Sequence, residues 1–148
     1  MLQNIKNLIF KTFGPKDCMG VFFSAFDAQG KLLLSHGVLE TDKTLDSLLD
    51  LFYNGMLKNI EPRISGIVFD FVTNLTSQQD LNIFLQMSPK DTGVVLTSIQ
   101  DGKSWVLLPD THGVNNMQQA IACIKQKYQL TGNWTITTFK TTKITFHK

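Results

Sequence analysis

The stretch that decides the fold runs from residue 92 to residue 113 and opens with Thr-Gly-Val-Val-Leu-Thr-Ser-Ile, residues 92–99. The turn formers Gln-Asp-Gly-Lys follow at 100–103, and a second apolar run, Ser-Trp-Val-Leu-Leu-Pro, ends at Pro109. Two apolar runs on either side of a short turn that contains Asp-Gly are typical of a β-hairpin. The sequence therefore predicts a hairpin over residues 92–109.

The same pattern occurs earlier in the chain, where residues 20–26 and 31–35 flank the turn Asp-Ala-Gln-Gly at 27–30. A helical pattern with apolar side chains on one face follows each hairpin. The two stripes are Leu45, Leu48, Leu49, Phe52 and Met56, and Met117, Ala120, Ile121, Ile124 and Tyr128. Corresponding members lie 72 positions apart, as do Gly30 and Gly102. We interpret this as one duplicated unit; the alternative is two similar but unrelated units.

These patterns predict an α+β fold with a single mixed curved sheet, built from two hairpin–helix–strand repeats, and helices packed on that sheet. We expect one domain, 1–148, with an N-terminal amphipathic helix over 1–14, repeat one over 20–73, a connector over 74–91 and repeat two over 92–146. The strand that closes each repeat is expected at 65–72 and at 133–146.

Helix starts and the connector are harder to read. Thr41 or Asp42 is expected to cap the first repeat's helix, and Asn115 the second's. In the connector, residues 76–79 fit a helical capping box. The alternating apolar residues at 81, 83, 85 and 87 nevertheless favour a turn followed by a strand.

Composition excludes several classes of protein. The net charge is only +2, and the basic residues form no stripe with interleaved aromatics, so we expect no nucleic-acid partner. The sequence has no apolar run long enough to span a bilayer and no signal peptide, so we expect a cytoplasmic protein without a membrane partner. Cys18 and Cys123 have no metal-type spacing and are expected to stay reduced. No phosphate-binding loop or metal motif is present, so no cofactor is predicted.

The candidate site consists of Ser35 and His36 after the first hairpin, and Asp110 and His112 after the second. Loops at strand ends expose backbone N–H groups that favour anions. If the repeats pair, the two loops would border one groove for a small anionic ligand or a protein partner, with the histidines as its titrating groups. The alternative is that these are ordinary solvated turns. Asp70 interrupts an apolar strand and is expected to point outward.

Three stretches resemble the AMMECR-type domain family, the protein A component of the AmmeMemoRadiSam system. They are residues 88–95 followed by Val-Leu-Leu-Pro at 106–109, the helix at 121–128, and residues 139–144. The resemblance implies a fold of two repeats on one curved sheet, and a small-ligand or partner-binding role beside redox or radical enzymes. The family's Leu-Arg-Gly-Cys-Ile-Gly signature is replaced here by Leu-Leu-Leu-Ser-His-Gly at 32–37. The chemistry of its cysteine therefore does not transfer to Ser35.

Two other functions compete with this one. Residues 20–32 read like the opening hairpin of a roadblock or longin interaction module, which would make the chain a protein-interaction domain. A hydrolase or transferase that uses His36 and His112 as acid and base is the third possibility. The sequence leaves open whether the protein is an enzyme.

Overall fold

The computed structural model describes residues 1–130 and 132–148, which form two compact units. Unit 1 comprises Met1–Val72 and Thr142–Lys148, and unit 2 comprises Thr73–Thr141. Unit 1 contains helix α1 (Leu2–Ile9), strands β1 (Val21–Phe26) and β2 (Leu32–Val38), and helix α2 (Leu45–Phe52). A π-helical turn (Tyr53–Leu57) and a 3₁₀ helix (Lys58–Arg63) then lead to strand β3 (Gly66–Gln78).

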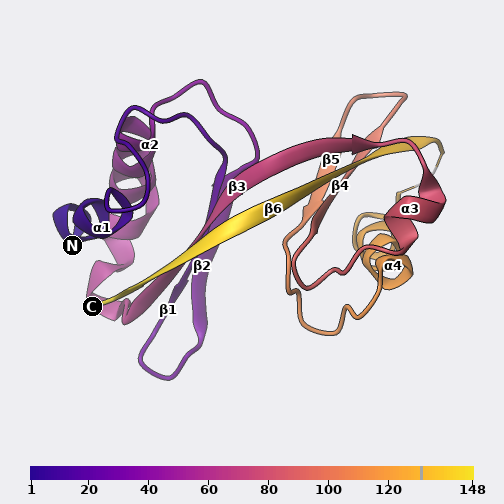
Figure 1. Ribbon diagram of the computed structural model, residues 1–148. Coiled ribbons are helices and arrows are strands. Elements are labelled where there is room, and N and C mark those ends of the chain that lie inside the picture. The colour runs from indigo at the N-terminus through magenta and orange to yellow at the C-terminus, as the bar shows by residue number, and fades with distance from the viewer. Residues whose placement is uncertain (131) are drawn as a thin grey trace. The chain divides into compact units, whose positions relative to one another are not determined.

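Unit 2 begins with the second half of β3 and continues with the short helix α3 (Leu81–Leu85). The hairpin of β4 (Gly93–Ser98) and β5 (Ser104–Leu107), helix α4 (Met117–Tyr128) and strand β6 (Trp134–His147) follow (Figure 1). The second half of β6 belongs to unit 1, so β3 and β6 each contribute to both units. Strands β4 and β5 pair antiparallel, which confirms the hairpin predicted over 92–109.

The hydrogen-bonded strand order is β2-β1-β3-β6-β4-β5, and the α+β class is confirmed. The pairs β1–β2, β1–β3, β4–β5 and β4–β6 are antiparallel, whereas we expected a mixed sheet. The reason is that the strand after each helix, β3 or β6, pairs with the first strand of the preceding hairpin, β1 or β4. Pairing with the second strand of the hairpin, β2 or β5, would have been parallel.

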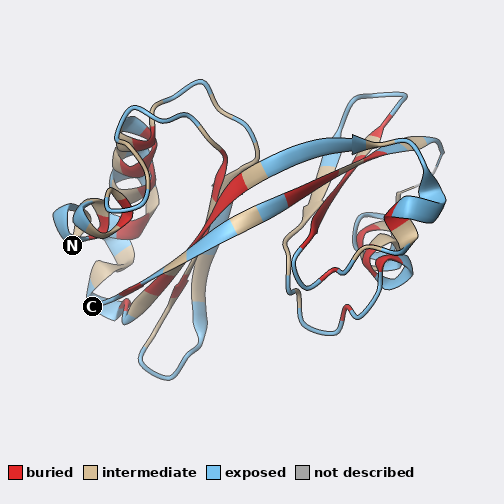
Figure 2. Ribbon diagram, viewed as in Figure 1, coloured by how far each residue is buried: buried red, intermediate tan, exposed pale blue. Residues whose placement is uncertain are grey.

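Helix α2 buries the predicted stripe, because Leu45, Leu48, Leu49 and Phe52 are all at most 4% exposed (Figure 2). Beyond Phe52 the wider π-helical turn places the next buried side chain five residues on, at Leu57 instead of the expected Met56. The N-cap also differs from the expected Thr41 or Asp42. The Thr44 side chain accepts a hydrogen bond from the backbone N–H of Ser47 at 3.3 Å.

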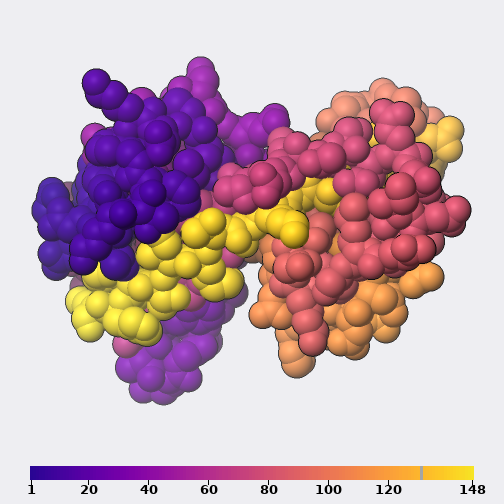
Figure 3. Space-filling view, in the orientation of Figure 1, coloured from indigo at the N-terminus to yellow at the C-terminus, as the bar shows by residue number. Residues whose placement is uncertain are grey.

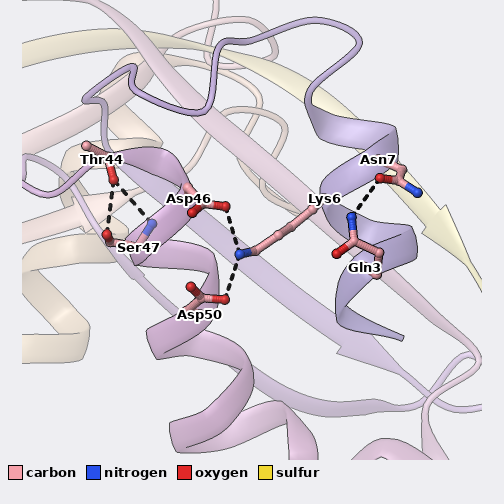
Figure 4. A network of polar contacts seen from close by, with 7 residues as sticks. All are labelled: Gln3, Lys6, Asn7, Thr44, Asp46, Ser47 and Asp50. Carbon is pink, nitrogen blue, oxygen red and sulfur yellow. Dashed lines mark hydrogen bonds and ion pairs between the residues drawn. The ribbon is translucent and has the colours of Figure 1, made fainter.

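Helix α1 is fixed to α2 by an ion-pair cluster (Figure 4). The Lys6 ammonium lies 2.7 Å from one carboxylate oxygen of Asp46 and 2.7 Å from one of Asp50. Burial of Lys6 works against its charged form and lowers its pKa, but the hydrogen bonds to Asp46 and Asp50 outweigh burial, and the net pKa is raised. Ile5 and Ile9 are the buried residues of α1, which is shorter than the expected 1–14.

Asp70 is buried, which contradicts the outward position expected for it. Its side chain is 9% exposed, and its carboxylate lies 3.1 Å from the Lys143 ammonium. An opposite charge at this distance offsets the cost of removing a carboxylate from water, so the strand tolerates the acid.

Helix α3 replaces the strand expected in the connector. Asp80 caps it, because the Asp80 carboxylate accepts hydrogen bonds from the backbone N–H groups of Asn82 at 2.9 Å and Ile83 at 3.3 Å. Leu81 and Ile83 are 54% and 56% exposed, while Phe84 is fully buried. The apolar alternation was therefore not a burial pattern. The preceding residues also differ from the prediction, since β3 extends to Gln78 instead of ending at Val72.

Helix α4 has the predicted buried residues Met117, Ala120 and Ile124, whereas Tyr128 is exposed. Its N-cap is Asn116, one residue after the expected Asn115, and the Asn116 side chain accepts from the Gln119 N–H at 2.8 Å. The buried residues of α4 pack against β4 and β6 and complete the core of unit 2. This core consists of Phe84, Val94, Leu96, Val114, Met117, Ala120, Ile124 and Ile136.

Candidate functional site

The predicted site residues fall in two places. Ser35 and His36 lie within β2 of unit 1, because that strand continues to Val38 where we expected a loop from residue 35. Asp110 and His112 lie, as predicted, in the connection after β5 of unit 2. Neither pair lines any of the three cavities described below.

The His36 ring packs against aromatic side chains of unit 1. Its centroid lies 5.9 Å from that of Phe52 and 6.4 Å from that of Phe23, in edge-to-face arrangements. Because Phe23 and Phe52 are buried core residues, His36 covers one edge of the core while its own side chain stays exposed. His36 thus has a packing role, and it lies in strand β2 instead of the predicted loop.

Asp110 has a structural role in unit 2. Its φ of 60° is in the left-handed region, where Asp is among the better tolerated residues. Its backbone N–H donates to the Pro89 carbonyl at 2.9 Å. This bond joins the connection after β5 to the segment 87–92, which forms one wall of the cavity described next.

Cavity 1, of about 340 Å³, lies in unit 2 and draws on three separate segments of the chain. The segments are the second half of β3, residues 87–92 and the middle of β6, and the lining residues are Asn74, Thr76, Gln78, Met87, Ser88, Asp91, Thr92, Thr138, Phe139 and Lys140. In Figure 3 the rose-coloured atoms of β3 and the segment before β4 form much of the face of unit 2 turned to the viewer. All the lining residues except Met87 and Phe139 carry a polar side chain.

Thr138 anchors the polar groups of this cavity. Its side chain is buried, and its hydroxyl accepts from Gln78 Nε2 at 2.8 Å and donates to the Thr76 carbonyl at 3.5 Å. Nearby, the Thr73 hydroxyl donates to the Lys140 carbonyl at 3.3 Å. These side-chain bonds between β3 and β6 hold the strand walls in place, so the cavity is preformed.

Asn74 and the loop complete the walls. Asn74 has a φ of 52° within β3, a left-handed conformation that Asn adopts more readily than most residues. Non-glycine residues in this conformation cluster at functional sites. In the loop, Ser88 Oγ accepts from the Lys90 N–H at 3.3 Å and the Thr92 hydroxyl donates to Asp91 Oδ1 at 3.0 Å. The loop wall is therefore held by its own local bonds.

Two further cavities are less suited to a specific ligand. Cavity 2, of about 430 Å³, shares Gln78 with cavity 1, and its charged lining residue, Asp80, is already engaged as the cap of α3. Cavity 3, of about 470 Å³, lies in unit 1 and is lined only by residues between Lys43 and Gly55. A hollow along one helix lacks converging walls, which ligand sites usually have.

Sequence reasoning missed cavity 1 because its β3 residues were read as a connector. A signal was present: residues 73–79 and 134–142 are both rich in Thr, Asn, Ser or Gln, which suits two polar strands that pair with one another. Among the residues that the structure describes, no cluster of His, Cys, Asp and Glu could hold a metal ion. None of the helices in the described part of the chain could cross a membrane.

Comparison with known proteins adds a likeness of fold. No protein-family model matches the chain, and no curated protein matches it. The solved structure of the uncharacterized protein PH0010 from Pyrococcus horikoshii is similar, with a TM-score of 0.65 and 12% identity over 88% of this chain and 75% of that one. At this identity the likeness concerns the fold alone.

Proposed function

We propose that this chain is a ligand-binding component, and that cavity 1 of unit 2 holds a small polar molecule. The observation that supports the proposal is the convergence of hydroxyl, carboxamide, carboxylate and ammonium groups from three segments on one preformed cavity. A few fixed polar groups in a concave site are what orient and select a small ligand. Under this proposal the binding residues differ from the predicted Ser35, His36, Asp110 and His112.

The AMMECR-type relationship and the internal duplication belong to the same proposal. Both are supported by the order hairpin, helix, long strand, which occurs first in β1, β2, α2 and β3 and again in β4, β5, α4 and β6. A small-ligand or partner-binding role is what the resemblance implies. Binding in cavity 1 gives that role a specific place in the chain.

The test is an occlusion experiment followed by NMR. A bulky side chain at Thr76, in the variant Thr76→Trp, would fill the cavity whatever the chemistry of the ligand. Ser35→Trp is the matched control, because Ser35 is also an exposed strand residue but lies outside the cavity. Both variants and the parent are titrated with amino acids, polyols, simple sugars, carboxylates and nucleosides while amide shifts are followed.

We expect at least one compound to shift the amides of residues 74–78, 87–92 and 138–140 saturably in the parent and in Ser35→Trp. The affinity of Thr76→Trp for that compound should fall at least tenfold. If no compound moves these amides, or if Thr76→Trp binds as well as the parent, cavity 1 is not a ligand site. If Ser35→Trp alone loses binding, the site is at β2 instead.

A further inference from the structure

Cavity 1 carries two opposite charges that have no ion-pair partner among the residues that the structure describes. Asp91 comes from the loop wall and Lys140 from β6, and both line the cavity. The ion pairs of the described residues involve other groups, so the Asp91 carboxylate and the Lys140 ammonium form none, with each other or with a third residue. Asp91 Oδ1 accepts from the Thr92 hydroxyl, so the second carboxylate oxygen of Asp91 and the exposed Lys140 ammonium remain to interact with a bound molecule.

The groups around these charges are neutral. Asn74, Thr76 and Gln78 offer carboxamides and a hydroxyl, which can both donate and accept hydrogen bonds. Met87 and Phe139 provide the apolar part of the lining. The cavity thus presents one negative charge, one positive charge and neutral polar groups on a lining whose exposed surface is mostly apolar. Its volume of about 340 Å³ is at the small end for ligand sites.

A ligand that satisfies this arrangement carries both charges itself. A simple anion would face the Asp91 carboxylate, and a simple cation would face the Lys140 ammonium. A neutral polyol would leave both charges to be partly desolvated without a partner, which is costly. A zwitterion lets its ammonium donate to Asp91 and its carboxylate accept from Lys140, in charge-assisted hydrogen bonds.

We propose that cavity 1 binds a free α-amino acid, with its ammonium group against Asp91 and its carboxylate against Lys140. This inference rests on the proposed function, because it names the ligand class of the same cavity. The neutral groups of Asn74 and Thr76 lie within the same lining as hydrogen-bonding partners. The side chain of the amino acid has the apolar lining of Met87 and Phe139 to contact.

The experiment compares compounds that lack one charge each. The parent protein is titrated, with amide shifts as readout, against the twenty common amino acids and, for the best binder, against its N-acetyl and its C-terminal amide derivative. Asp91→Asn and Lys140→Gln each remove one charge from the cavity. The controls are Asp42→Asn and Lys11→Gln, which remove the same charges at exposed residues outside the cavity and its wall segments.

We expect the parent and both controls to bind the amino acid at least tenfold more tightly than either derivative. Asp91→Asn should lose its preference for the free amine over the N-acetyl form, and Lys140→Gln its preference for the carboxylate over the amide. Loss of selectivity, unlike loss of binding, does not arise from a general folding defect. If neutral polyols shift the cavity amides as strongly as amino acids do, the zwitterion proposal fails and the proposed function stands. If no compound shifts them, both fail.

Discussion

Gly93 cannot accept a side chain, and the cost of adding one follows from the structure. A Cβ at this position would lie 2.3 Å from Cζ of Phe139 and 2.6 Å from both adjacent ring carbons. Carbon atoms in contact need about 3.5 Å, so the shortfall exceeds about 1 Å. Phe139 is 1% exposed and cannot swing into solvent to relieve the contact. Overpacking of this kind costs about 1–3 kcal/mol.

For Gly93→Ala we therefore expect the free energy of unfolding to fall by about 1–3 kcal/mol, measured by urea unfolding. At this chain length that corresponds to a melting temperature lower by about 2–12 °C. Gly55→Ala is the matched control, because nothing lies within 4 Å of a Cβ added there. It should be neutral or stabilising by up to about 1 kcal/mol.

A second step separates the ring contact from other causes. In a Phe139→Leu background the smaller side chain leaves space, so the cost of adding Gly93→Ala should shrink by at least about 1 kcal/mol, as expected for residues in direct contact. If Gly93→Ala costs the same in both backgrounds, or if it is as stable as the parent, the close packing of Phe139 on Gly93 is not what constrains this position.

Three further predictions concern stability and the cysteines. Lys6→Met removes two 2.7 Å ion pairs and should cost about 1 kcal/mol. Because the pKa of Lys6 is raised above its ordinary 10.5, this contribution should be complete below pH 10.5 and disappear as the pH rises through the raised pKa; a parent–variant difference in urea midpoint that grows above pH 10.5 would refute this. Leu48→Ala, at a residue 3% exposed, should cost about 2–5 kcal/mol, and a thermal scan matching that of the parent would contradict the core assignment. Cys18 is exposed and Cys123 half-buried, and both are free, so a thiol reagent should label Cys18 first; a mass two hydrogens lower in the non-reduced protein would mean that they are bridged.

Much of the fold was readable from the sequence because burial follows the periodicity of each element. The stripe from Leu45 to Phe52 and the residues Met117, Ala120 and Ile124 of the second stripe were predicted to be buried, and the structure buries them. The prediction failed where apolar spacing did not reflect burial. Leu81 and Ile83 alternate like strand residues but are exposed on a helix that Asp80 caps. The hydrogen bonds of the Asp80 side chain favour a helix in that segment, and such bonds cannot be inferred from the spacing of apolar residues.

The candidate site was harder to predict than the fold, for a physical reason. Gln78 and Thr138 are 60 positions apart, and only the pairing of β3 with β6 brings their side chains within 2.8 Å. Polar strand residues also have no apolar period to mark them, so β3 was expected to end at Val72. Ser35 and His36 drew attention by residue type, but His36 packs on Phe23 and Phe52 at the edge of a core.

The shared strands have a consequence for how this protein is made. Unit 1 takes its last strand segment from Thr142–Lys148, and Phe146 of that segment is part of its buried core. Residues 1–72 are synthesised before this segment, and the whole of unit 2 is translated in between. During that time strand β3 of unit 1 lacks its neighbour β6. Unit 2 is continuous in sequence and has all its strands sooner. During synthesis unit 1 therefore cannot complete its sheet first, as an N-terminal unit usually does, because both sheets need β6 and the half that belongs to unit 1 is made after the half that belongs to unit 2.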